Sequence, residues 1–453
     1  MVFSSIEFLL YFLPIFMILY AVTPQAYRNV TLLTGSIIFY ALGEPKYLAL
    51  LVVSVLVNYF VGLHLARGRH GKESAGRHRK RKILLIWAII GNIGTLILFK
   101  GAPNELGLPL GISFYTFQIM SYLIDVYRGE IRRERSVLNL ATYITMFPQL
   151  ISGPIVNYDE VAGSLKNREI TAEGIQDGLK VFVLGLAAKV ILADRIGILW
   201  REVQTTGFES ISTPLAWIAA IAYSMKIYFD FYGYSLMAIG LGRMLGFELP
   251  ENFHDPYMAR GVRDFYRRWH MTLGRWFRKY VYIPLGGNRK GELRTVLNLL
   301  GVWVLTAMWH GATPNFLAWG LCLWFFIVLE RQMTRIKLVK WMQVVPHLYL
   351  WFVIPITWMC FAITDISQLQ VYLGRMFGVV KGINVNVLDW QRALGNYWWL
   401  FLVCFLACTP LVKMVYEKVK NHLAGQLALG ALFWFCVWQI IVQGENTFMY
   451  FRF

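Results

Sequence analysis

His310 is the side chain whose type and surroundings point most directly to chemistry. It follows Trp309 and precedes Gly311, between two apolar stretches, Thr295–His310 and Asn315–Leu329. An ionisable side chain inside an apolar membrane segment is costly and by default marks a functional site. A neutral imidazole can accept a proton from a hydroxyl group, the general-base role that histidine fills most often. The alternative is a histidine that only hydrogen-bonds a neighbouring helix.

A second group of candidate residues lies upstream, in the segment Leu241–Arg294. Apolar and aromatic residues recur there at i, i+3, i+4 and i+7 from Val262 to Tyr280, which predicts one amphipathic helix. His270 lies at the border of its apolar face, where a lone histidine beside aromatic residues is more often a packing residue than a catalyst. The rest of the helix is basic and carries Arg263, Arg267, Arg268, Arg275, Arg278 and Lys279.

The basic side of this helix has two interpretations. It can belong to an interfacial helix that aromatic side chains and anionic lipids hold at the membrane surface. It can also line a cytoplasmic opening that receives an anionic substrate, such as coenzyme A or the phosphopantetheine of an acyl carrier protein. Composition alone favours the first interpretation.

The elements that must position these residues are membrane helices. The chain has 453 residues, of which 57% are apolar and 15% charged, and this is more apolar surface than a soluble fold of that length hides. A spanning helix needs about 20 mainly apolar residues. We therefore expect one all-α polytopic domain over residues 1–453. Stretches that approach the required length include Phe8–Val22, Ile83–Phe99, Leu108–Val126, Leu179–Leu199, Pro214–Phe229, Trp341–Ile363, Tyr397–Val412 and Leu427–Val442.

Two further apolar stretches should be broken. Val137–Val156 is interrupted by Pro148 and Pro154. Such breaks at membrane depth are tolerated only inside protein or beside a cavity, so this stretch fits a re-entrant element. The two apolar arms on either side of Gly311–Pro314 should enter and return as a hairpin with His310 at its apex.

The net charge of +18 is distributed as in a membrane protein and gives no reason to expect nucleic acid as a partner. Basic residues gather in short loops, and Arg67–Lys82 holds eight Lys or Arg against one Glu. Arg128–Arg135 and Leu241–Arg294 are basic as well, and the positive-inside rule places all three segments in the cytoplasm. This topology leaves both chain termini outside.

Several other kinds of site are not indicated. The chain has no P-loop and no Gly-x-Ser-x-Gly motif, so ATP hydrolysis and serine esterase chemistry are not expected. His64, His70 and His78 have no cysteine or carboxylate at ligand spacing, which argues against a metal site. The five cysteines lie in or beside apolar segments, which argues against a disulfide framework.

Longer motifs resemble a known family. The chain closely resembles the membrane-bound O-acyltransferases, and within them the inner-membrane subunit group of the alginate O-acetylases, in FYRRWHMTLGRWFRKYVYIPLGGNRKG (Phe265–Gly291) and TAMWHGATPNFLAWG (Thr306–Gly320). Matching motifs also occur in the same order at Gly111–Gly129, Phe147–Ile155 and Tyr228–Tyr257. The D-alanyl transfer proteins of teichoic acid synthesis are similar in the Trp-His motifs, but YIPLGGNR resembles the acetylase group more.

The resemblance implies a fold and a set of site residues. The fold is a bundle of about 11–12 transmembrane helices, with re-entrant and amphipathic cytoplasmic helices around a central tunnel. His310 matches a near-invariant family histidine and His270 a second histidine of the active region, so both are expected to be catalytic within a catalytic segment at 241–320. Expected donor-binding residues are Arg267, Arg268, Arg275 and Trp269. Residues expected to support the tunnel are Trp309, Asp230, Asn252, Pro148 and Gln149.

The reaction that the resemblance implies is O-acyl transfer across the bacterial inner membrane. Acetyl-CoA or an acyl carrier protein would serve as a cytoplasmic thioester substrate, and no bound cofactor is expected. The acceptor would be an extracytoplasmic polysaccharide hydroxyl, with an esterase-like partner of the SGNH type completing the transfer. Alternatives are D-alanyl or other acyl transfer, a flippase for an acylated carrier, and a scaffold for the partner. A flippase needs alternating access, and the chain shows no internal repeat of the transporter kind.

Overall fold

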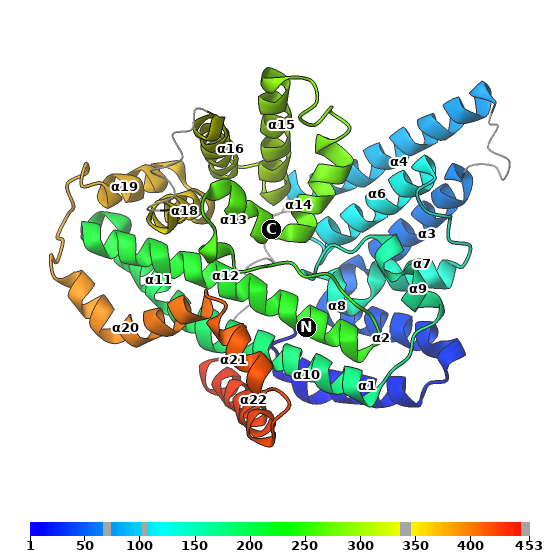
Figure 1. The fold of residues 1–453 in the computed structure, drawn as a ribbon, viewed down its shortest axis with the longest axis horizontal. Coiled ribbons are helices and arrows are strands. Elements are labelled where there is room, and N and C mark those ends of the chain that lie inside the picture. Colours follow the sequence, from blue (N-terminus) through cyan, green and yellow to red (C-terminus); the bar gives the residue numbers. More distant parts are fainter. Residues whose placement is uncertain (67–73, 102–106, 336–345, 445–453) are drawn as a thin grey trace. The chain divides into compact units, whose positions relative to one another are not determined.

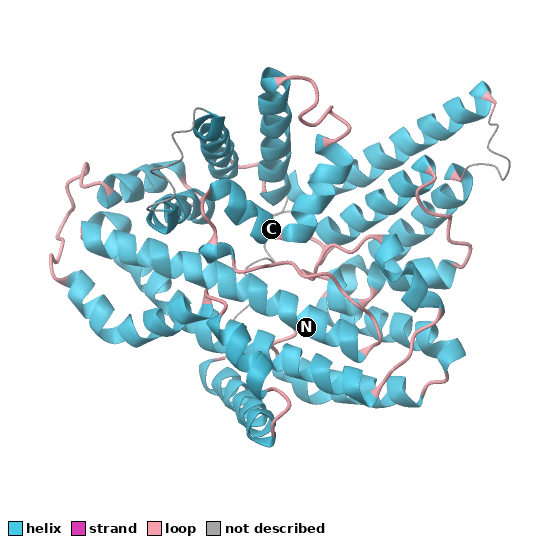
Figure 2. Ribbon diagram, in the orientation of Figure 1, coloured by secondary structure: helices cyan, strands magenta, loops and turns pink. Residues whose placement is uncertain are grey.

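The computed structural model describes residues 1–66, 74–101, 107–335 and 346–444. Every regular element in these ranges is a helix, as Figure 2 shows. The predicted all-α class is therefore confirmed. Part of the predicted basic loop Arg67–Lys82, the start of the stretch Trp341–Ile363 and the C-terminal tail lie outside the described residues.

The described chain folds into two compact units that share helix α12 (Thr213–Met244). Unit 1 comprises residues 1–184 and 234–250 with the end of the last helix, and unit 2 comprises residues 185–233 and 251–439. Figure 1 labels the helices of both units. Unit 1 contains the π-helical turn Glu7–Phe12, α1 (Leu13–Val22), α2 (Arg28–Gly43), α3 (Leu48–Leu65), α4 (Ala75–Gly101), α6 (Ile112–Arg128), α7 (Val137–Thr145), α8 (Phe147–Leu150), α9 (Tyr158–Lys166) and most of α10 (Ala172–Ala187).

The predicted break in Val137–Val156 is present. Helix α7 ends at Thr145, and the four-residue helix α8 follows with Pro148 in its first turn. Proline has no N–H to continue a helical ladder, so it is tolerated at a helix start and not inside. The chain then runs through a turn without regular structure to Asn157, which caps α9.

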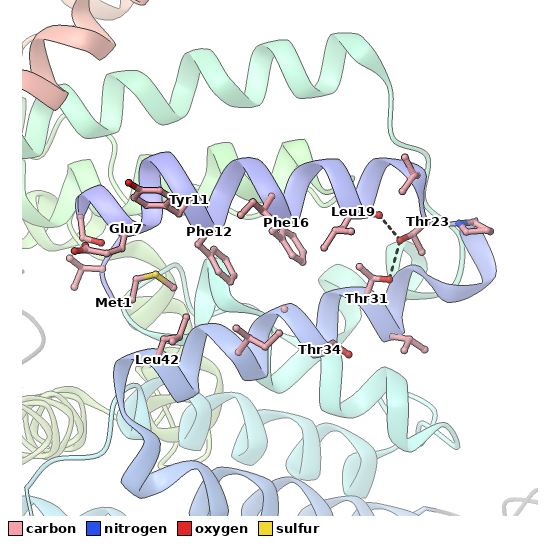
Figure 3. Close-up of a pocket in the computed structure, with 18 residues that line it drawn as sticks. Met1, Glu7, Tyr11, Phe12, Phe16, Leu19, Thr23, Thr31, Thr34 and Leu42 are labelled. Carbon is pink, nitrogen blue, oxygen red and sulfur yellow. Dashed lines mark hydrogen bonds between the residues drawn. The ribbon is translucent and has the colours of Figure 1, made fainter.

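A groove of about 1160 Å³ lies between α1 and α2 in unit 1. Figure 3 shows that its walls are mainly apolar side chains, among them Phe12 from the π-helical turn before α1, Phe16 from α1 and Leu42 from α2. The Thr23 hydroxyl closes one end by hydrogen bonds to the Leu19 carbonyl oxygen and to the Thr31 hydroxyl, at 2.7 and 3.1 Å. No candidate site residue lines this groove.

Unit 2 holds the predicted catalytic segment. Its helices are the first part of α12, α11 (Asp194–Thr206), α13 (Val262–Arg268), α14 (Met271–Phe277), α15 (Glu292–His310), α16 (Pro314–Arg335), α18 (Pro346–Ala362), α19 (Ile366–Met376), α20 (Asp389–Ala407), α21 (Leu411–Val419) and most of α22 (Leu423–Gln443).

The predicted hairpin around His310 is confirmed. Helix α15 ends at His310 and α16 begins at Pro314, and the two lie side by side in Figure 1. Gly320 allows this approach, because a Cβ there would lie 2.8 Å from the Trp303 carbonyl oxygen. Small residues at such contacts are typical of helices that pack within a membrane.

The prediction of one continuous amphipathic helix from Val262 to Tyr280 is wrong. Helix α13 ends at Arg268, α14 starts at Met271, and a π-helical turn follows. His270, at the break, has a left-handed backbone with φ of 44°. The apolar periodicity continues through the break, so the pattern did not reveal it.

Four described helices are long and apolar enough to cross a membrane, namely Pro45–Leu65, Ala75–Gly101, Pro314–Thr334 and Leu423–Gln443. The straight span predicted over Tyr397–Val412 is instead the pair α20 and α21, bent by 74°. Pro410 precedes α21, and its missing N–H explains why the first helix does not continue. The polytopic class is confirmed, and the number of about 11–12 spans stays a prediction.

Candidate active site

His310 is the last residue of α15 and lies in an aromatic cage. Its side chain is buried, and the ring centroids of Trp309, Trp319 and Phe361 lie 4.5, 5.0 and 5.1 Å from its own. These rings meet the imidazole edge to face. The cage keeps bulk water away from the ring.

The turn after His310 depends on Gly311 and Pro314, which the sequence analysis placed between the two arms of the hairpin. A Cβ at Gly311 would lie 2.6 Å from the ring of Phe316, so a larger residue would displace that ring. Pro314 opens α16, and the Asn315 side-chain amide then donates to the carbonyl oxygens of Cys360 and Phe361 at 3.3 and 3.4 Å. The hairpin apex is thereby tied to the end of α18.

His270 lies in a second buried position, where the segment from Glu251 crosses the break between α13 and α14. The His254 N–H donates to the Arg268 carbonyl oxygen and the Met271 N–H donates to the Asn252 carbonyl oxygen, both at 2.9 Å. These long-range bonds satisfy backbone groups that a continuous helix would otherwise pair. They explain the left-handed conformation of His270, which costs energy for a non-glycine residue.

The His270 ring is neutral at physiological pH. Burial lowers the pKa of His270 to about 3, because the charged imidazolium loses its hydration. Its Nδ1 lies 3.0 Å from Asn252 Oδ1. Its Nε2 is buried and has no hydrogen-bond partner among the described residues.

Trp309 brings the two predicted catalytic histidines to one place. Its indole centroid lies 4.5 Å from that of His310 and 6.3 Å from that of His270. One histidine comes from the hairpin and the other from the broken segment, so neither position alone reveals the pairing. Both imidazoles therefore lie close to one indole, where either could exchange a proton with a bound substrate.

A family model described as MBOAT, membrane-bound O-acyltransferase family, matches residues 105–372, which is more than half of the sequence and includes both histidines. The chain belongs to the MBOAT family. It is therefore a membrane-bound O-acyltransferase and a multi-pass membrane protein.

Individual MBOAT relatives extend the match beyond the family model. The probable alginate O-acetylase of Pseudomonas fluorescens is 36% identical over 84% of this chain and 75% of its own length. The peptidoglycan O-acetyltransferase of Helicobacter pylori is 32% identical over 84% of this chain and 80% of its own length. The teichoic acid D-alanyltransferase of Bacillus subtilis is more distant, at 28% identity over 48% of this chain and 58% of its own length.

The predicted donor-binding residues of this MBOAT chain have different surroundings. Arg267 and Arg275 are exposed, and Arg268 is half-buried and pairs with Asp264 at 3.3 Å. Trp269 is buried, and its ring stacks on Phe265 at 5.4 Å. The arginines remain candidates for donor phosphates, whereas the indole is placed to hold α13.

Asp230, predicted to support the tunnel, forms a buried ion pair with Lys189, a residue that the sequence analysis did not single out. Lys189 Nζ lies 2.9 Å from Asp230 Oδ1, and Asp194 also binds this ammonium group. Lys189 lies in a π-helical turn, Ala188–Ala193, between α10 and α11. Phe231, next to Asp230, meets the His270 ring edge to face at 4.8 Å. The sequence signal that could have identified Lys189 is a lysine within an apolar stretch, where a charged side chain is costly.

Glu330 is a second residue that the sequence analysis missed. Its buried carboxylate, on α16, accepts hydrogen bonds from the N–H groups of Val262 and Arg263 at 2.6 and 3.0 Å. It thus caps the first turn of α13, where anionic groups complement unpaired N–H groups and the helix dipole. This cap ties the segment that leads to His270 to the hairpin that carries His310.

Pro148 and Gln149, two residues predicted to support the tunnel, belong to unit 1. Both are fully buried in the break between α7 and α8. The Gln149 amide donates to the Tyr143 carbonyl oxygen, and its Oε1 has no hydrogen-bond partner among the described residues. Their predicted role in the tunnel stays a prediction.

Proposed function

We propose that this O-acyltransferase moves an acetyl group from a cytoplasmic thioester to a hydroxyl group of an extracytoplasmic polysaccharide. The observation that carries this proposal is the pair of buried histidines beside Trp309, on two elements that meet within one unit. Acetyl is preferred because the alginate and peptidoglycan O-acetyltransferases match far more of the chain than the D-alanyltransferase does.

His310 acts in this proposal as the general base. Its imidazole takes the proton from the acceptor hydroxyl while that oxygen attacks the carbonyl carbon of the thioester. The carbon–sulfur bond then breaks, and the proton passes to the departing thiolate. The aromatic cage holds the imidazole in one orientation and excludes water that would compete as an acceptor.

The donor is either acetyl-CoA or an acetylated acyl carrier protein, and Arg267, Arg268 and Arg275 are its proposed phosphate contacts. An SGNH-type protein outside the inner membrane is the proposed partner that receives the acyl group or delivers it to the polymer. Both chain termini are proposed to face that side. Transfer of D-alanyl to a cell-envelope polymer is the second candidate, since a D-alanyltransferase is among the relatives.

Replacement of His310 tests the proposal. His310→Ala should abolish O-acetylation of the envelope polysaccharide in cells, because it removes the general base. The protein should still fold, because the substitution changes the buried volume only slightly. The measurement is ester-linked acetate released from purified polymer by alkali, with membrane insertion checked by resistance of the protein to extraction with alkaline carbonate. His254→Ala is the matched control, because the His254 side chain is 57% exposed and should leave acetylation unchanged. Wild-type acetylation by a folded His310→Ala protein would disprove the assignment.

The donor is tested with purified protein. Acetyl-CoA, acetylated acyl carrier protein and D-alanylated carrier protein are each incubated with wild type and His310→Ala in the presence of a polysaccharide acceptor, and release of free thiol is followed. The proposal expects His310-dependent release from one of the two acetyl donors. Release of thiol from the D-alanylated carrier alone would show that the transferred group is D-alanyl and not acetyl.

A further inference from the structure

Asn252 contacts three successive residues at the break that carries His270. Its backbone carbonyl oxygen accepts from the Met271 N–H at 2.9 Å. Its side-chain Oδ1 lies 2.9 Å from the Thr272 hydroxyl, 3.3 Å from the Thr272 nitrogen and 3.0 Å from His270 Nδ1. Asn252, His270 and Thr272 are buried. One asparagine therefore holds the backbone after His270 and contacts its ring.

The Thr272 amide decides which atom of the Asn252 side chain points at His270. A backbone N–H can only donate, so the atom that it meets must be the carboxamide oxygen and not the nitrogen. That oxygen can only accept, so His270 Nδ1 must carry the hydrogen of their shared bond. In a neutral imidazole the other nitrogen, Nε2, then carries the lone pair.

We propose that Asn252 is a positioning residue that fixes neutral His270 in its Nδ1–H form and leaves Nε2 as a proton or hydrogen-bond acceptor. This inference rests on the proposed function for its meaning in catalysis. It restricts what His270 can do beside His310, because a neutral ring in this form cannot donate from Nε2. His270 acts through the lone pair on Nε2, which accepts a hydrogen bond or a proton from the substrate.

Burial keeps His270 neutral, and no charged side chain among the described residues contributes to the lowering of its pKa. The rings that face it are those of Phe231 from α12 and Trp309 from α15, and the third neighbour is the Asn252 oxygen. Glu251 and His254 flank Asn252 in sequence, but their side chains are 61% and 57% exposed. Arg268, two residues before His270, pairs with Asp264. A charge introduced at position 252 would therefore be a new feature of this site.

Asn252→Asp tests the proposal through the pH profile. The carboxylate can accept every hydrogen bond that the asparagine oxygen accepts, and it also stabilises the imidazolium. An opposite charge at this distance raises a histidine pKa by about one to three units. The acidic limb of turnover against pH should therefore move upward by about that amount. Turnover is measured as thiol release from acetyl-CoA by the purified protein.

Thr272→Val is the matched control for this experiment. It removes one hydrogen bond to the same oxygen and adds no charge, so it should lower stability and leave the acidic limb in place. A role for Asn252 limited to packing predicts that Asn252→Asp also leaves the limb in place. That result in a folded variant would overturn the proposal.

A readout that needs no acyl transfer separates this inference from the proposed function. In protein labelled with ¹⁵N-histidine, the signals lost in His270→Gln identify His270, and their shifts distinguish the two neutral forms. The Nδ1–H form is expected in wild type, and Asn252→Ala should release the ring into a mixture of both. Observation of the Nε2–H form in wild type would overturn the proposal. If wild type releases no thiol from acetyl-CoA, acetyl-CoA is not the donor. The NMR measurement still tests the role of Asn252, because it does not depend on acyl transfer.

Discussion

At the scale of single residues, the arginines of α13 separate the two interpretations of the basic segment. Arg267 is exposed and Arg268 is half-buried beside Asp264, so both can reach an anionic donor at a membrane surface. A lost hydrogen bond between charged groups costs about 1.5–3 kcal/mol. Arg267→Ala and Arg268→Ala should therefore raise the apparent KM for the donor about tenfold or more and change kcat less. The measurement is a donor titration of thiol release.

His270→Ala is measured in the same donor titration. If the segment lines the donor entrance, this variant too should raise the apparent KM for the donor. Arg392→Ala on α20 is the matched control, because this exposed arginine lies outside the catalytic segment and should leave the KM unchanged. If the α13 variants keep the wild-type donor KM and lose only turnover, the segment is an interfacial anchor.

At the scale of elements, α13 is a seven-residue helix whose start depends on another helix. Glu330 supplies two hydrogen bonds to its first turn, and Gly261 leaves room for the carboxylate, since a Cβ there would lie 2.8 Å from Glu330 Oε1. Glu330→Ala should expose these N–H groups and destabilise the segment by about 1.5–3 kcal/mol. The expected result is faster hydrogen exchange at Val262 and Arg263 and lower turnover.

Two variants calibrate this element. Glu330→Gln keeps one acceptor oxygen without the charge and should fall between wild type and Glu330→Ala. Glu417→Ala removes a half-exposed glutamate of α21 that pairs with Lys420, and should leave exchange in α13 unchanged. Unaltered exchange at Val262 in Glu330→Ala would show that the cap does not hold this helix.

At the scale of the whole molecule, the topology rests on three basic segments that share one side of the membrane. Gly76 lies at the start of α4 and Asn384 lies in the loop before α20, and both are exposed. Gly76→Cys should react with a membrane-impermeant maleimide only from the cytoplasm, and Asn384→Cys only from outside. Intact cells and inverted vesicles provide the two directions of access, and the unsubstituted chain gives the background from its five native cysteines. Labelling of both sites from the same side would contradict the assignment of the spans.

The sequence by itself determined the class of the protein and the hairpin of His310. Apolar composition and the positive-inside pattern predict a polytopic membrane protein. An apolar helix can cross a bilayer because its backbone hydrogen bonds are satisfied within the helix. The hairpin is equally local, since Gly311 and Pro314 stop one helix and start the next. The break at Pro148 follows from the same backbone chemistry.

Only the tertiary structure decided how the second histidine is held. The periodicity of Val262–Tyr280 predicts one helix. It is interrupted at His270, where Asn252 accepts hydrogen bonds from Met271 and Thr272 and the His254 N–H donates to Arg268. Two buried charged residues in the same unit also have partners that local sequence does not reveal, since Glu330 binds an N–H 68 residues away and Lys189 on one helix meets Asp230 on another. The free-energy differences between residues in helix propensity are small compared with the cost of burying an unpaired polar group. The site is therefore set by long-range pairing, which periodicity and motif spacing do not contain.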